Sequence, residues 1–172
     1  MALSRTLIRT VAIDGRLPSR AIARANDLIL ADARSGLFVT AIYAVLEPEC
    51  AQVAFVNAGH MPPLLVRATD GAATLLRKHG MALGILPGSE FEEVTIYLYP
   101  GDILILYTDG VIEATDNKQE MFSRERLIEV VQNHRRQSAT QLVETIDEAI
   151  GAFIGDASQF DDLTVLVAKR IP

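Results

Sequence analysis

Five apolar residues run without interruption from residue 103 to residue 107, and the run ends close to Asp109-Gly110. A strand with no polar alternation is expected to be buried on both faces, as in the middle of a sheet. Residues 163–168 predict a second strand, and here an acid, Asp161, comes before the strand. If the two strands are antiparallel neighbours, Asp109 and Asp161 meet at the same edge of a sheet. Buried carboxylates repel each other unless a cation lies between them, so this pattern suggests a metal site.

The rest of the chain alternates between helical and extended patterns. Apolar residues at helical spacing predict helices at residues 2–12, 18–34, 123–132 and, after a capping box, 138–155. Aromatic, β-branched or alternating runs predict further strands at residues 38–46, 52–57, 64–68, 73–77 and 92–99. We therefore expect an α+β fold with two antiparallel β-sheets covered by helices.

Composition narrows the class of protein. The chain has 172 residues, of which 49% are hydrophobic and 22% charged, so it can bury a core as a single domain spanning residues 1–172. A net charge of -6 argues against a nucleic-acid partner. No apolar stretch approaches the roughly 18 residues of a membrane span, and the N-terminus lacks a secretory signal, so we expect no membrane partner. The single cysteine, Cys50, favours the reducing cytoplasm and is expected at a surface or strand edge.

Four motifs then occur in a fixed order along nearly the whole chain. They are NAGHMPP at residues 57–63, GMALG at 80–84, YTDGVIEA at 107–114 and DDLT at 161–164. Their order and spacing resemble the bacterial PPM-type metal-dependent serine/threonine phosphatases, and the nearest branch looks like the stage II sporulation E group. That resemblance implies a sandwich of two antiparallel sheets flanked by helices, with two Mn²⁺ or Mg²⁺ ions at one end.

The resemblance also assigns roles to residues of this chain. Asp109 and Asp161 match the two C-terminal metal ligands of the family, and Gly110 belongs to the same Asp-Gly motif. We expect Asp162 to bond backbone groups beside the neighbouring ligand, and a role as a ligand itself is the less favoured alternative. We expect Glu113 to be a structural or supporting acid four residues after Asp109. No covalent nucleophile is implied, because water activated by the metal attacks the phosphate.

His60 is the one histidine within a family motif. We expect it to order the turn through backbone hydrogen bonds, and contact with substrate is the less favoured alternative.

One part of the family pattern is missing from this sequence. Family members carry strands with an acidic residue and a Gly-Asp motif ahead of the first helix, and these supply the carboxylate that bridges the two metals. The first 34 residues contain no Gly-Asp pair. We therefore expect the chain to correspond to about the C-terminal three quarters of the family fold and to hold at most one ion weakly. Uncovered sheet or helix surface would then favour self-association.

Two functional hypotheses follow. The first is a metal-dependent phosphatase that acts on phosphoserine or phosphothreonine of a regulatory protein, such as an antagonist of an anti-sigma factor, with activity impaired in the isolated chain. The second is a non-catalytic, phosphatase-like interaction module in sigma-factor or stress signalling. A third hypothesis, a small-molecule-binding β-sandwich, rests on fold alone.

Overall fold

The computed structural model describes residues 17–32, 38–77, 80–157 and 161–171. They fall into two compact units, each with its own antiparallel sheet, and each is considered by itself below. The first unit comprises residues 1–62 and 77–97, and the second comprises residues 63–76 and 98–172. The helix predicted at residues 2–12 lies outside the described residues. That the whole chain forms one domain stays a prediction.

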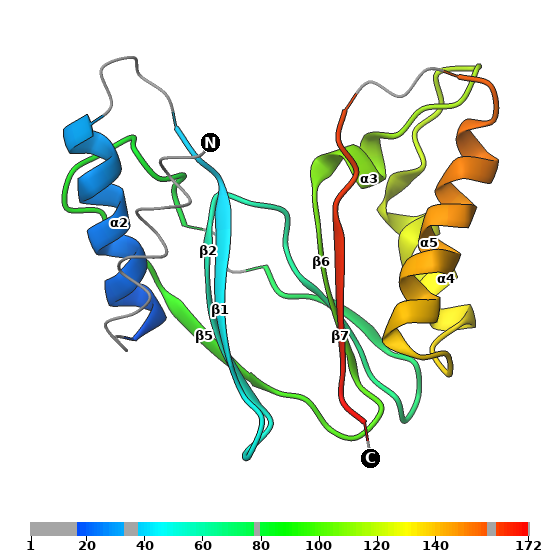
Figure 1. Ribbon diagram of the computed structural model, residues 1–172, viewed down its shortest axis with the longest axis horizontal. Coiled ribbons are helices and arrows are strands. Elements are labelled where there is room, and N and C mark those ends of the chain that lie inside the picture. The colour runs from blue at the N-terminus through cyan, green and yellow to red at the C-terminus, as the bar shows by residue number, and fades with distance from the viewer. Residues whose placement is uncertain (1–16, 33–37, 78–79, 158–160, 172) are drawn as a thin grey trace. The chain divides into compact units, whose positions relative to one another are not determined.

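The first unit contains a three-stranded sheet and one described helix (Figure 1). Its elements are α2 (Pro18–Asp32), β1 (Ala41–Glu47), β2 (Gln52–Ala58) and β5 (Glu93–Tyr97), and the strand order is β1-β2-β5. Proline at the start of α2 suits the first turn of a helix, where no backbone N–H is required. The helix packs on the sheet through an apolar cluster of Ile22, Ile29, Val56, Ala58, Leu83 and Phe91.

β1 and β2, which correspond to the strands predicted at residues 38–46 and 52–57, form an antiparallel hairpin, paired from Ala41 with Ala58 to Glu47 with Gln52. The predicted start of the first strand at Phe38 was wrong, because β1 begins only at Ala41. Val39 instead exchanges backbone hydrogen bonds of 2.9 and 2.8 Å with Leu83, in the loop before β5. Cys50 lies exposed in the turn after β1, as expected.

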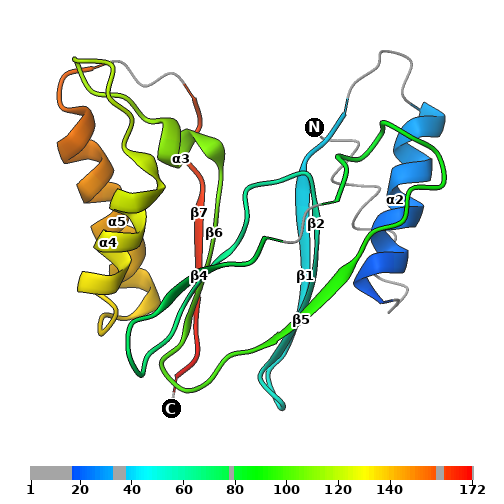
Figure 2. The same cartoon turned by 180° about the vertical axis from the view of Figure 1, so that it is seen from behind.

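The second unit contains a four-stranded antiparallel sheet of order β4-β3-β6-β7. Its strands are β3 (Leu64–Val66), β4 (Ala73–Leu75), β6 (Ile103–Tyr107) and β7 (Val165–Lys169), and its helices are α3 (Asp109–Glu113), α4 (Ser123–Asn133) and α5 (Ala139–Ile154). α4 and α5 lie side by side along the sheet, and α3 follows directly at the end of β6 (Figures 1 and 2). Four of the five residues of β6 are buried, so the predicted central strand is confirmed.

α5 begins and ends where the sequence predicts. The Ser138 side chain accepts a hydrogen bond from the Gln141 backbone at 3.2 Å, and the Gln141 side chain accepts one from the Ser138 backbone at 3.0 Å. This is the predicted capping box, which satisfies two backbone donors that the first turn of a helix leaves free. Gly155, with a φ of 58°, ends the helix.

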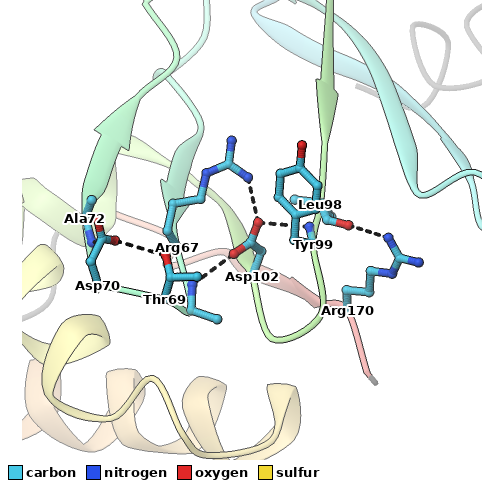
Figure 3. Close-up of polar contacts among 9 residues, drawn as sticks. Arg67, Thr69, Asp70, Ala72, Leu98, Tyr99, Asp102 and Arg170 are labelled. Carbon is cyan, nitrogen blue, oxygen red and sulfur yellow. Dashed lines mark hydrogen bonds and ion pairs between the residues drawn. The ribbon is translucent and has the colours of Figure 1, made fainter.

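Asp102 is a buried carboxylate that sequence analysis did not single out. It is 1% exposed and joins the start of β6 to the β3–β4 hairpin (Figure 3). One oxygen accepts from Arg67 at 2.6 Å and from the Tyr99 backbone at 2.9 Å, and the other accepts from the Ala68 backbone at 2.9 Å. Three hydrogen-bond donors compensate the cost of burying the Asp102 carboxylate. Asp102 therefore connects the turn after β3 to the turn before β6.

Those donors also set the protonation of Asp102. Burial by itself raises the pKa of the Asp102 carboxyl, but the hydrogen bonds from Ala68, Tyr99 and Arg67 together outweigh burial. The pKa is therefore lowered from its ordinary value of 3.8, and the group stays ionised in the folded protein.

The α+β class with two antiparallel sheets and covering helices is confirmed. Within the described ranges, no helix is both long and apolar enough to cross a membrane.

Candidate metal centre at the ends of β6 and β7

β6 and β7 are neighbouring antiparallel strands, as the sequence analysis required. Their register runs from Ile103 paired with Lys169 to Tyr107 paired with Val165. Asp109 follows the end of β6 and Asp161 precedes the start of β7, so both lie at the same end of the sheet. The topology therefore brings together two acids that are far apart in the sequence.

Thr108 extends the pairing of β6 with β7 by one residue beyond Tyr107 and Val165. Its backbone N–H donates to the Thr164 carbonyl at 3.1 Å. Its hydroxyl donates to the Asp162 carbonyl at 3.2 Å and accepts from the Thr164 N–H at 3.1 Å. Thr108 lies in the YTDG motif, but the sequence pattern alone indicates no role for it.

Gly110 provides a close approach between the two acidic segments. A Cβ built on Gly110 would lie 2.7 Å from the Asp162 carbonyl oxygen and 3.5 Å from the Cβ of Asp161. Real side chains essentially never come this close to a backbone oxygen, so only glycine fits here. The glycine of the Asp-Gly motif is therefore explained sterically, because any side chain after Asp109 would collide with the Asp162 carbonyl.

Asp109 and Asp161 make the same local contact. In each, one carboxylate oxygen accepts the N–H of the following residue, at 3.1 Å for Asp109 and 2.8 Å for Asp161. Both residues are exposed, so the expectation that they would be buried was wrong, and repulsion between buried charges does not apply. The case for a metal rests instead on their shared position. A carboxylate has about four lone-pair sites, so these contacts leave capacity for a ligand.

The supporting acids occupy different positions. The contacts that fix Asp162 are made by its backbone, to Asp161 and to Thr108, in keeping with a supporting role. Glu113 is the last residue of α3, four residues after Asp109, and is exposed. The helical spacing expected for this pair is confirmed, whereas the function of Glu113 stays a prediction.

The donor set fits part of the coordination of a hard divalent ion. Mg²⁺ and Mn²⁺ prefer oxygen ligands, and Mg²⁺ usually keeps several waters while one or two carboxylates bind it. Asp109 and Asp161 supply two carboxylates. In the portion of the chain that is described, no group of three or more His, Cys, Asp or Glu side chains could enclose an ion.

The NAGH motif is ordered by Asn57 rather than by the histidine ring. Asn57 is 2% exposed, and its side-chain oxygen accepts from the His60 backbone N–H at 2.7 Å. Its amide donates to the carbonyls of His60 and Met61 at 3.0 and 3.4 Å. His60 thus contributes backbone groups to the turn, as predicted, while its ring lies 3.2 Å from the Thr40 hydroxyl.

The fold is shared by solved phosphatase structures. The SiaA PP2C domain of Pseudomonas aeruginosa superposes with a TM-score of 0.82 at 19% identity, covering 98% of this chain and 68% of that one. The RsbU and RsbW domains of Rv1364c from Mycobacterium tuberculosis superpose with a TM-score of 0.79 at 22% identity, covering 100% of this chain and 47% of that one. The fold is therefore that of the PP2C-type, or PPM, phosphatases.

Sequence relatives specify the branch. The family model described as stage II sporulation protein E matches residues 1–171, and the chain belongs to this family. Phosphoserine phosphatase RsbU of Bacillus subtilis is 25% identical over 171 residues, which are 99% of this chain and 50% of RsbU. Protein IcfG of Synechocystis sp. is 30% identical over 151 residues, which are 87% of this chain and 24% of IcfG. The chain thus spans half or less of the length of these relatives, and the family named from its motifs is confirmed.

Proposed function

We propose that this chain is a metal-dependent phosphatase domain that hydrolyses phosphoserine or phosphothreonine on a regulatory protein. The observation that carries the proposal is the meeting of Asp109 and Asp161 at one end of the β6–β7 pair. Family membership supports it, because RsbU, which is similar over nearly the whole of this chain, is named a phosphoserine phosphatase.

Asp109 and Asp161 are the residues proposed to hold Mn²⁺ or Mg²⁺. The catalytic domain of the phosphatase PstP, which shares the fold with a TM-score of 0.66, was solved with two manganese ions. When bound, a divalent ion neutralises phosphate charge and lowers the pKa of water. Two carboxylates match the hard-oxygen preference of such an ion. Because the described residues contain no group of three or more side chains arranged to hold a metal, we expect at most one weakly held ion.

The chain's own groups have separable tasks in this proposal. Asp109 and Asp161 bind the cation. One carboxylate oxygen of each also accepts a hydrogen bond from the backbone N–H of the following residue, which fixes the orientation of the carboxylate. Gly110 allows the two segments to approach, and the Asp162 backbone supports Asp161. No side chain is required to form a covalent bond to phosphorus, because water is the nucleophile.

The proposed substrate is a phosphorylated protein such as an antagonist of an anti-sigma factor, acting in the cytoplasm. This follows from the sporulation-type family, and Rv1364c, which shares the fold, has an RsbU and an RsbW domain. We propose no nucleic-acid partner, because a net charge of -6 disfavours binding to phosphate.

Self-association is a further part of the proposal. Leu166 on β7 is 52% exposed, and β7 is the last strand of its sheet in the described structure. An edge strand with an exposed apolar side chain favours pairing with another chain. Light scattering over a range of concentrations should therefore show species larger than a monomer, and a monomer at all concentrations would contradict this.

The test of the function is hydrolysis of p-nitrophenyl phosphate and of a phosphoserine peptide, with and without Mn²⁺. Asp109→Asn and Asp161→Asn should each remove the Mn²⁺-dependent rate, since each removes one of two charged ligands. Glu148→Gln, an exposed acid on α5, is the matched control and should keep the rate. A rate of hydrolysis that does not depend on Mn²⁺, or a Mn²⁺-dependent rate that both variants retain, would contradict the proposal. No turnover by the unaltered chain would favour the non-catalytic interaction module instead.

A further inference from the structure

Thr108 stands at the N-cap of α3 but does not cap that helix. A threonine at this position usually accepts a hydrogen bond from a backbone N–H in the first turn of its own helix. Here its side chain makes no such bond, although its backbone is extended, with φ of -85° and ψ of 161°. The hydroxyl is directed instead to the segment that precedes β7, so its hydrogen bonds are made with residues distant in the sequence.

The hydroxyl uses both of its hydrogen-bonding functions on the segment that carries Asp161. It donates to the Asp162 carbonyl at 3.2 Å and accepts from the Thr164 N–H at 3.1 Å. Asp162 and Thr164 lie just after Asp161, and β7 begins only at Val165. The Thr108 hydroxyl and the Thr108 backbone N–H therefore link the DDLT segment to the end of β6.

The same residue is bonded directly to Asp109. Thr108 therefore links Asp109, its neighbour in the chain, to Asp162 and Thr164, which follow Asp161. Gly110 complements it sterically, since the Asp162 carbonyl that accepts from Thr108 also lies against Gly110. Groups that orient metal ligands in this way typically change metal affinity about 10-fold to 100-fold when they are removed.

We propose that Thr108 is the positioning residue of the candidate metal centre: its hydroxyl holds the Asp161 segment at the distance from Asp109 that a divalent cation requires. The inference rests on the proposed function, because it assumes that Asp109 and Asp161 share an ion. The methyl group of Thr108 is not part of it, so serine should serve as well as threonine.

The test is the dissociation constant for Mn²⁺, measured by titration calorimetry on the whole chain without substrate. Thr108→Val keeps the shape but has no hydroxyl, and Thr108→Ala removes the hydroxyl without adding a methyl group. Both should weaken Mn²⁺ binding about 10-fold or more, whereas Thr108→Ser should bind as the unaltered chain does. Circular dichroism at the titration temperature shows which variants are folded, and one folded variant lacking the hydroxyl is sufficient.

A second measurement needs no metal. Amide hydrogen exchange at Thr164 should speed up in Thr108→Val and Thr108→Ala but not in Thr108→Ser, because the Thr164 N–H loses its acceptor only in the first two. Unchanged Mn²⁺ affinity in both variants that lack the hydroxyl would overturn the proposal, and so would an equal loss in Thr108→Ser.

Asp109→Asn, titrated in parallel, separates this inference from the proposed function. If Asp109→Asn loses Mn²⁺ and Thr108→Val does not, only the positioning role fails. If Asp109→Asn binds Mn²⁺ as the unaltered chain does, the metal centre itself is contradicted and the positioning role falls with it.

Discussion

Gly110 and Asp162 are in backbone contact at the point where the two acidic motifs meet. A Cβ on Gly110 would stand 2.7 Å from the Asp162 carbonyl oxygen, and backbone atoms on both sides have little freedom to move away. The pairing of β6 with β7 and the glycine of the Asp-Gly motif therefore depend on each other.

Replacing Gly110 by alanine should displace the segment that carries Asp161. We expect a loss of about 1–3 kcal/mol in the free energy of unfolding, as is typical of overpacked sites, and weaker Mn²⁺ binding. Gly151→Ala is the control, because nothing lies within 4 Å of its Cβ position in α5. Alanine is the better helix former, so this control should gain about 0.5–1 kcal/mol. Urea denaturation of both variants measures the contrast, and equal effects would contradict the contact.

Asp102→Asn should destabilise the second unit. Asparagine has a single side-chain acceptor oxygen, so its NH2 group must face a donor on one side and at least one hydrogen bond is lost at a site that is 1% exposed. We expect a cost on the order of 1–3 kcal/mol near neutral pH. Asp70→Asn is the control, because the exposed Asp70 uses one side-chain oxygen that asparagine retains.

The same substitution should change the pH dependence of stability. Because the pKa of Asp102 is lower in the folded chain, its ionisation stabilises the fold at pH values above the ordinary value of 3.8. This contribution is lost as the pH falls through the folded pKa. The stability difference between the unaltered chain and Asp102→Asn should be constant near neutrality and shrink below pH 3.8. Denaturation curves over this range measure it, and a difference that grew in acid would contradict the assignment.

Ser138→Ala should weaken the start of α5. It removes the oxygen that accepts the Gln141 N–H at 3.2 Å, and such N-cap losses cost about 0.5–2 kcal/mol. Thr140→Ala, at an exposed position of the first turn, should be neutral or slightly stabilising because alanine favours helices. If the two variants unfold at the same denaturant concentration, the capping box does not contribute in solution.

Asn57 offers a test in the first unit. Asn57→Ala should cost about 1–3 kcal/mol, because His60 and Met61 then lose a buried partner. Asn57→Asp should be at least as destabilising near neutral pH, since a buried carboxylate would face two carbonyl oxygens. Thermal unfolding followed by circular dichroism measures both, and an aspartate variant as stable as the unaltered chain would show that the amide donors are dispensable.

Periodicity and turn chemistry predicted most of the secondary structure. The apolar run of β6, the strands predicted at residues 64–68 and 73–77, and the capping box of α5 each depend on neighbouring residues alone. All are present, although β3 and β4 are shorter than predicted. The start of β1 was missed because Val39 pairs with Leu83, and a single long-range bridge leaves no local pattern. The division of the chain into two units likewise depends on which distant strands pair, which spacing does not specify.

The two acids of the candidate site could be predicted from the sequence, but their exposure to solvent and their hydrogen-bond partners could not. Asp109 and Asp161 were found from the mirrored order of acid and strand, and the structure brings their segments together. Their exposure was not foreseen, since strand burial does not extend past the strand ends. The roles of Thr108 and Asp102 were missed because each contacts backbone groups that are distant in the sequence. Asn57 contacts His60 and Met61, three and four residues further on, so its role was missed although its partners are close in the sequence. An acid between a Pro-Gly turn and an apolar strand was the available indication for Asp102.

The pairing of Ile103 with Lys169 has a consequence for the order of events in synthesis. Asp109 leaves the ribosome well before Asp161, and α4 and α5 are made between them. Bringing β7 next to β6 closes the long segment between them, and the loss of chain entropy precedes the formation of any β6–β7 hydrogen bond. The two acids can therefore be brought together only after β7 has been translated, so capacity to bind a cation would mark a chain in which β7 has been made and has paired with β6.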